Sequence, residues 1–199
     1  MKFCHFRTVG FLISLCAGCL FLFSCASTTK TAGAEISPVY ITNSKKFFLL
    51  PPERIERNID SLQLIVGSFG SSEFAMQVYL QADAAGFSLF LLNDFGTNMG
   101  TLSYDGMRVR FDSSLFPKGL KAEYIAADLQ FAYYRPEAIS DALSEIGLRF
   151  DVLVDSDGTE VRRIMDKEKC IEEIRRGAGT TVITNFLRDY RYHLQEAEE

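Results

Sequence analysis

The chain has 199 residues, of which 21 are Lys or Arg and 26 are Asp or Glu, so its formal net charge is −5. The first 24 residues contain two basic residues and no acidic one, so the rest of the chain is more acidic still. An acidic surface repels phosphate backbones, which excludes nucleic acid as an expected partner. The remaining length suits a single domain with its own core.

Residues 1–24 have the pattern of a secretory signal. Lys2 and Arg7 precede an apolar run from Val9 to Phe23, and a small residue, Ser24, ends it. The run is typical of a signal peptide and is shorter than the roughly 20 residues that a membrane-spanning helix needs. An uncut membrane anchor and an ordinary, non-lipidated signal remain as alternatives.

The end of this segment, Leu-Phe-Ser-Cys at residues 22–25, resembles the lipobox of bacterial lipoproteins. In that family the signal is cut before the Cys, which then carries acyl chains such as palmitate, and several chains anchor a protein more firmly than one. The resemblance predicts lipidation at Cys25, with Cys16 and Cys19 as rival sites. Because Ala26 rather than Asp follows, it also implies the periplasmic face of the outer membrane in the cell envelope.

Residues 25–38 are mostly small and polar, which predicts a flexible tether between the lipid and a single domain at residues 39–199. Within that domain Cys170 is the only cysteine. An internal disulfide is therefore excluded, and the stability of the domain has to come from packing.

The domain begins with patterns typical of strands. A short strand is expected at residues 39–42, and Pro51-Pro52 interrupts regular structure. Alternating or continuous apolar runs with turn signals between them then predict a meander of about five antiparallel strands, at residues 62–69, 74–82, 87–92, 99–104 and 107–111.

The apolar period then changes to that of a helix. It predicts two helical pieces at residues 125–133 and 139–146, with Pro136 between them and Gly147 as a C-terminal cap. Strand patterns resume afterwards and predict a second meander, at residues 149–154, 160–165, 169–175, 180–186 and 188–194. Together these elements predict an α+β fold.

Two meanders with an inserted helical pair, behind a lipobox, resemble the LolA/LolB family of lipoprotein carriers over residues 38–195. A closer resemblance is to uncharacterised LolB-related lipoproteins, a domain of unknown function sometimes encoded with aryl-polyene pathways. Arg135 stands where those relatives have a Trp. The residues that carry this resemblance are 127–136, Ile139, Leu143, Asn185, Arg188, Tyr190, Tyr192 and Leu194.

The resemblance implies an antiparallel sheet curled into an incomplete (half) barrel, with the two helices covering its concave face over an apolar cavity. The implied function is non-catalytic: an outer-membrane-anchored protein binds or transfers a lipid, acyl or polyene chain. An exposed loop that helps insert lipid, as in LolB, would be residues 95–99. The candidate cavity residues are Phe74, Met76, Val78, Leu80, Phe87, Leu89, Leu91, Met107, Val109, Phe111, Leu129 and Leu143.

The same apolar residues are equally compatible with a filled core. In that case the protein would be a structural or assembly lipoprotein that acts through its surface on protein partners, which the sequence does not identify. An exposed apolar patch would favour this alternative.

Catalysis, for example by a lipid-ester hydrolase, is the remote alternative. His193 is the only His beyond residue 5, and its alternation with Tyr192 predicts a strand surface rather than a catalytic group. One His and one spare Cys do not supply the three or four ligands of a zinc site, and residues 155–158 predict a hairpin rather than a calcium loop. We therefore expect no catalytic residue, no metal and no cofactor.

Overall fold

The computed structural model describes residues 38–113 and 121–197. These residues belong to one compact unit, Ala34–Glu199. The predicted signal, the lipidation site Cys25 and most of the predicted tether lie outside the described residues. None of the helices within the described ranges is long and apolar enough to cross a membrane.

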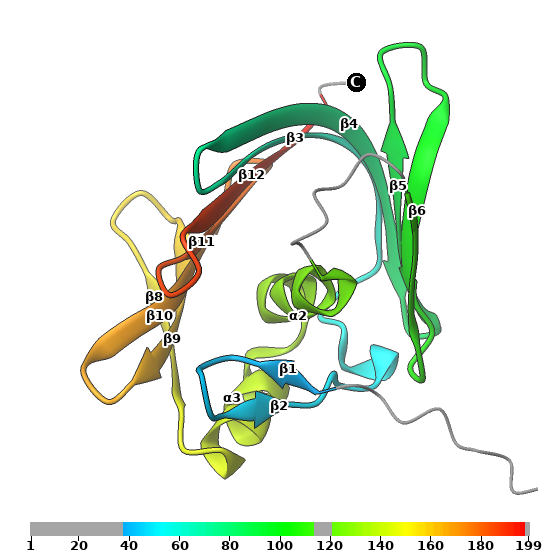
Figure 1. Ribbon diagram of the computed structural model, residues 1–199. Helices are drawn as coiled ribbons and strands as arrows, with labels where there is room; N and C mark the ends of the chain where they lie inside the picture. Colours follow the sequence, from blue (N-terminus) through cyan, green and yellow to red (C-terminus); the bar gives the residue numbers. More distant parts are fainter. Residues whose placement is uncertain (1–37, 114–120, 198–199) are drawn as a thin grey trace, which may run out of the picture. The chain divides into compact units, whose positions relative to one another are not determined.

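A ten-stranded antiparallel sheet forms most of the structure (Figure 1). Its order is β7-β6-β5-β4-β3-β12-β11-β10-β9-β8, and it does not close on itself. The two predicted meanders are confirmed. The first consists of β3 (Ile59–Phe69), β4 (Ser72–Asp83), β5 (Gly86–Leu92), β6 (Asn98–Tyr104) and β7 (Val109–Ser113). The second consists of β8 (Arg149–Val154), β9 (Glu160–Asp166), β10 (Lys169–Gly177), β11 (Thr180–Asn185) and β12 (Tyr190–Glu196).

One long-range strand pair joins the two meanders. β12 pairs with β3 in antiparallel register, so that Tyr192 lies opposite Gly67 and His193 lies opposite Val66. The first strand of the first meander thereby meets the last strand of the second, and β7 and β8 become the two edges of one sheet. The sheet is strongly bent, and both meanders face helix α2 (Figure 1).

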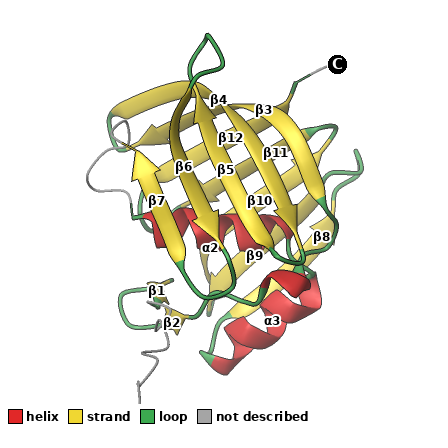
Figure 2. Cartoon of the chain, turned by 90° about the vertical axis from the view of Figure 1, so that its right-hand side faces the viewer, coloured by secondary structure: helices red, strands yellow, loops and turns green. Residues whose placement is uncertain are grey.

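The two predicted helices are α2 (Ala122–Tyr133) and α3 (Pro136–Glu145), and they lie between the two edge strands in the chain. Pro136 is tolerated as the first residue of α3 because its missing N–H would have no partner there. Gly147 follows that helix with φ of +71°, which favours glycine at a C-terminal cap. α2 lies on the inner side of the bend, whereas α3 packs mainly against β8 (Figures 1 and 2).

A small hairpin packs beneath α2. It consists of β1 (Val39–Tyr40) and β2 (Lys46–Phe47), and the 3-10 helix η2 (Pro52–Arg54) follows it. The ring of Phe47 lies 4.9 Å from that of Phe131 on α2, measured between centroids. One apolar cluster therefore contains this hairpin, both helices and the inner face of the sheet.

Candidate functional site

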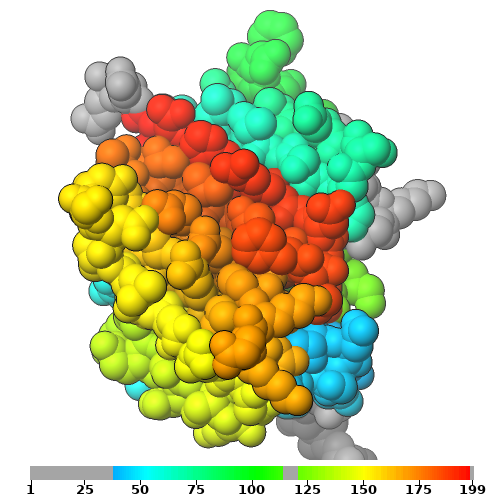
Figure 3. All heavy atoms as spheres, turned by 90° about the vertical axis from the view of Figure 1, so that its left-hand side faces the viewer, coloured from blue at the N-terminus to red at the C-terminus, as the bar shows by residue number. Residues whose placement is uncertain are grey.

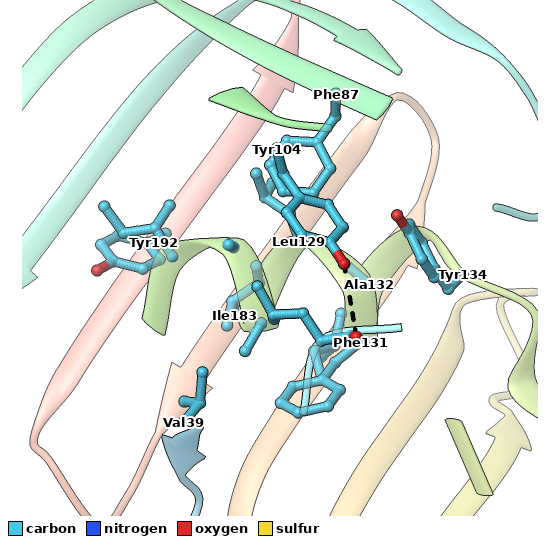
Figure 4. Packing of buried hydrophobic residues seen from close by; sticks show 14 of the residues in the cluster. Val39, Phe87, Tyr104, Leu129, Phe131, Ala132, Tyr134, Ile183 and Tyr192 are labelled. Atoms are coloured by element: carbon cyan, nitrogen blue, oxygen red, sulfur yellow. Dashed lines mark hydrogen bonds between the residues drawn. The ribbon is translucent and has the colours of Figure 1, made fainter. Parts of the chain in front are cut away.

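An enclosed space remains between α2 and the inner face of the sheet. Its volume is about 20 Å³, which is room for about one water molecule. Leu129 of α2 and two residues of the sheet, Ile183 and Tyr192, line this space and are labelled in Figure 4. The lining is almost wholly apolar and consists of Ile65, Phe74, Leu89, Leu91, Ile125, Asp128, Leu129, Ile183, Tyr192 and Leu194.

The residues predicted as a cavity wall divide into three groups. Four of them line the enclosed space: Phe74, Leu89, Leu91 and Leu129. Seven others belong to the same core without lining the space. Four of these are buried (Val78, Leu80, Phe87 and Leu143), and three are partly buried (Met76, Val109 and Phe111).

Met107 does not belong to this wall. Its side chain is 63% exposed, because it lies in the turn between β6 and β7 rather than on a strand. The Asp105 carboxylate accepts hydrogen bonds from the backbone N–H groups of Met107 and Arg108 and so fixes that turn. The strand predicted at residues 107–111 therefore begins too early, because Met107 belongs to the turn and the inward-facing residues begin at Val109.

The prediction missed the lining residues that come from the second meander and from β3. Ile183, Tyr192 and Leu194 alternate along β11 and β12 in the same way as the predicted residues alternate along β4 and β5. Asp128 was missed as well, although it falls three residues after Ile125 on the apolar side of the helix. A charged residue within such an apolar face was the available signal.

Asp128 belongs to a buried polar cluster at one end of the enclosed space. The hydroxyl of Tyr190 donates to its carboxylate, at 2.9 and 2.8 Å from the two oxygens. The Nδ2 of Asn185 lies 3.3 Å from the same hydroxyl and donates at 2.8 Å to Glu172 Oε2. Asp128, Glu172, Asn185 and Tyr190 are each no more than 4% exposed.

Burial sets the titration of these groups. It raises the pKa of Asp128 well above its ordinary value, and the nearby charge of Glu172 acts in the same direction. Burial also raises the pKa of Glu172, to about 7, against the opposing hydrogen bond from Asn185 and the charge of Arg188. A pair of buried carboxyls therefore retains protons at pH values where exposed carboxyls are ionised.

Two polar atoms of this region use no hydrogen bond within the described residues: Glu172 Oε1 and the hydroxyl of Tyr192. Tyr192 lines the enclosed space. Burial raises the pKa of its hydroxyl, and the charges of Asp128 and Glu172 raise it further. The cluster therefore has unused hydrogen-bonding capacity next to an apolar space.

A second polar network lies at the C-terminal end of α2. Arg162 of β9 is fully buried, and its Nη1 donates to the carbonyl oxygens of Phe131 at 3.1 Å and Tyr134 at 2.7 Å. Its other two nitrogens pair with Glu56 at 2.9 Å and Glu160 at 2.7 Å. Every nitrogen of this guanidinium has a partner, so the network secures the end of the helix and leaves no nitrogen of Arg162 for a ligand.

Other residues with chemical potential lie apart from the cavity. His193 is half-buried on the outer face, between Val182 and Val66 of the neighbouring strands. Cys170 is half-buried, and burial raises the pKa of its thiol. No group of three or more His, Cys, Asp or Glu side chains among the described residues could hold a metal ion.

The loop predicted to contact lipid forms the tip of the β5–β6 hairpin. Phe95 in that loop is 92% exposed, and the hairpin projects beyond the rest of the sheet (Figure 2). The side chain and carbonyl of Asn93 hold this tip through hydrogen bonds from the backbone of Phe95, Gly96 and Thr97. An exposed aromatic side chain is thus presented on a well-formed loop.

These features define an α+β protein with an open antiparallel sheet, a helix on its inner side and a small apolar space between them. The chain belongs to a family of proteins of unknown function, DUF3261, whose model matches residues 60–198. The match includes both helices and all ten strands of the sheet except the first residue of β3. No curated protein matches the chain.

Proposed function

We propose that this protein is an outer-membrane lipoprotein, anchored through acyl chains on Cys25, that binds or transfers an apolar chain in a half-barrel cavity. The observation that carries the proposal is the apolar space enclosed between α2 and the inner face of the sheet. The bent sheet with a helix on its inner side and the lipobox at residues 22–25 support a LolA/LolB-like carrier. An acyl or polyene chain would be the ligand, and no covalent chemistry is required.

The size of the space indicates how such a ligand would enter. Binding sites for small molecules have volumes of about 300–1,000 Å³, whereas the enclosed space has about 20 Å³. An apolar chain would therefore have to displace part of α2 from the sheet. Burial of the chain, at about 25 cal/mol per Å² of apolar surface, would offset the lost helix contacts.

The contacts of α2 favour movement of its first half. Its last turn is held by Arg162 and by Gln130, whose side-chain amide makes two hydrogen bonds to the backbone of Leu50. Its first half contacts the sheet through Ile125, and its middle does so through Leu129 and the hydrogen bond between Asp128 and Tyr190. Lys121 provides no side-chain cap at the start of the helix. We expect the helix to pivot about its C-terminal end.

The test uses the absence of tryptophan from the sequence. Leu89→Trp places an indole in the cavity wall, and Leu92→Trp places the same residue on the opposite face of the same strand. The unit Ala34–Glu199 contains every buried core residue and is the protein to use. A lipid with a brominated acyl chain should quench the indole fluorescence of Leu89→Trp at low ratios of lipid to protein, and that of Leu92→Trp much less.

Native mass spectrometry of the unsubstituted unit, purified from a bacterial periplasm, completes the test. We expect a discrete bound lipid or polyene, retained in Leu92→Trp and also in Leu89→Trp, whose quenching requires a bound lipid. Overpacking should lower the free energy of unfolding of Leu89→Trp by about 1–3 kcal/mol, so circular dichroism must show that it is folded. Unquenched fluorescence of Leu89→Trp, together with an empty unsubstituted protein, would refute the carrier function.

A second function is favoured by a different observation. Leu62, Leu64 and Val66 lie along the outer face of β3 and are 38%, 45% and 45% exposed. The neighbouring outer face of β8–β12 is covered by side chains from five adjacent strands (Figure 3). A structural or assembly lipoprotein would use such an apolar row to contact a protein partner. Loss of in vivo cross-links in Leu64→Glu with unchanged lipid content would favour this alternative.

The exposed loop at Phe95 would serve delivery rather than storage. An aromatic side chain inserts readily into the interfacial region of a bilayer. Phe95→Ser should slow transfer of a bound lipid to acceptor vesicles and leave equilibrium binding unchanged. Equal transfer rates in the two proteins would remove this role from the loop.

A further inference from the structure

The polar end of the cavity has properties that apolar chain binding alone does not explain. Glu172 Oε1 and the Tyr192 hydroxyl are buried and make no hydrogen bond within the described residues. A buried polar atom without a partner lowers stability by about as much as a lost hydrogen bond, so such atoms call for a physical explanation. Tyr192 lines the space, whereas Glu172 is joined to the lining residue Asp128 through Asn185 and Tyr190. A third atom of this kind, Gln63 Oε1, belongs to an amide that donates to Ser61 instead.

This region also contains more acidic groups than basic ones. Asp128 and Glu172 are two acidic groups, and Arg188 is the basic group whose charge acts on both. The guanidinium of Arg188 makes its hydrogen bonds to the carbonyl oxygens of Tyr40 and Ile41 and to the Tyr124 hydroxyl. It therefore offsets part of the negative charge from a distance and leaves the carboxyl oxygens without a direct cationic partner.

We propose that Asp128 and Tyr192, which line the space, bind the polar head of the apolar ligand, with Glu172 in the cluster behind them, and that the three select an amine over a carboxylate. This inference rests on the proposed function, that the cavity holds an apolar chain. An ammonium group donates three hydrogen bonds and brings the positive charge that two buried carboxyls lack. The apolar walls formed by Ile125, Leu129 and other lining residues would then hold the attached chain.

The same geometry disfavours a ligand that ends in a carboxylate. A carboxylate head would bring a negative charge into a buried setting that already disfavours the charged forms of Asp128 and Glu172, whereas an ammonium would favour those charged forms. A neutral alcohol should bind with an affinity between those of the amine and the carboxylate, because it donates one hydrogen bond and carries no charge. A buried water could also use the spare oxygen atoms, but it would confer no preference among ligands.

The experiment compares three probes with the same chain: dodecylamine, dodecanol and dodecanoate. Each competes with N-phenyl-1-naphthylamine for the unit Ala34–Glu199 below the probe's micelle concentration. We expect dodecylamine to bind about tenfold more tightly than dodecanoate, since hydrogen bonds to charged groups are the stronger ones, with dodecanol between them. The double variant Asp128→Asn/Glu172→Gln, which keeps side-chain size, should abolish this preference.

A matched control removes two acidic groups elsewhere. Glu73 and Asp112 are exposed and do not line the space, so Glu73→Gln/Asp112→Asn should keep the tenfold preference. If the cavity double variant still prefers the amine, the preference comes from the acidic surface, and the inference is overturned. Equal binding of the three probes would overturn it as well, while the proposed carrier function would stand. No binding of any probe, or of the naphthylamine, would refute both.

Discussion

Two polar networks of opposite character hold the middle and the C-terminal end of helix α2. At the C-terminal end, each nitrogen of Arg162 has an acceptor, and the amide of Gln130 makes two hydrogen bonds to the backbone of Leu50. At the middle of the helix, Asp128 meets a cluster in which Glu172 Oε1 and the Tyr192 hydroxyl have no partner among the described residues. A saturated network fixes a structure, whereas an unsaturated one next to a cavity is suited to a ligand.

Breaking the saturated network should have the largest effect. Arg162→Met leaves the carbonyls of Phe131 and Tyr134 without this donor and Glu56 without its buried cation. Glu56 keeps Arg176 at 3.0 Å, but each carbonyl that loses its buried donor costs about 1–3 kcal/mol, so we expect the free energy of unfolding to fall by about 2–5 kcal/mol. Urea denaturation of the unit Ala34–Glu199 measures this loss.

The control is the adjacent arginine on the opposite face of β9. Arg163 pairs with Glu173 at 2.7 Å, but its side chain is 39% exposed. Because water screens that pair, Arg163→Met should lower the free energy of unfolding by less than about 1 kcal/mol. Equal losses in the two variants would show that the Arg162 network has no special role in securing the helix.

The sequence predicted the strands and helices because their patterns are local. The alternation from Phe74 to Ala82, the turn at Asp105-Gly106 and the helical spacing from Ile125 each depend on neighbouring residues. The pairing of β12 with β3 joins residues more than 100 positions apart, and no local pattern encodes it. The single sheet, and hence the convergence of lining residues from both meanders, had to come from the structure.

The candidate site was predicted only on its apolar side. Leu89, Leu91 and Phe74 were found by alternation, but Glu172 lies in a strand whose polar residues face both ways. Glu172 points inward and Glu173 outward, and the irregular register between β9 and β10 near Cys170 alters the alternation there. A buried carboxyl at such a position is invisible to a rule that assigns charged residues to the surface.

A variant of the unsaturated network should change how stability depends on pH. Burial raises the pKa of Glu172 from 4.5 to about 7, so the folded state keeps a proton that the unfolded state releases. Stability from this group is therefore full at acidic pH and falls as the pH rises from about 4.5 to about 7. Glu172→Gln cannot ionise and should be more stable than the unsubstituted protein at pH 8, by about 3 kcal/mol.

The comparison needs urea denaturation at pH 5 and pH 8. Arg188 also acts on Glu172, and the raised pKa of Asp128 gives a pH dependence of the same sign. Glu172→Gln should therefore reduce the slope without removing it. Glu173→Gln, which changes the outward-facing neighbour, should leave the slope unchanged. A slope that is identical in Glu172→Gln and the unsubstituted protein would contradict the burial argument.

The smallest expected effect separates two tyrosines on one strand. Tyr190 donates to Asp128, whereas the Tyr192 hydroxyl has no partner in the described part of the chain. Tyr190→Phe should lower the free energy of unfolding by about 1–2 kcal/mol, because it removes a buried donor from a carboxyl; Tyr192→Phe should change it by less than about 0.5 kcal/mol. Urea denaturation at pH 7 measures both. If Tyr192→Phe proves as destabilising as Tyr190→Phe, the Tyr192 hydroxyl is a structural group, and the contrast between the saturated and the unsaturated network fails.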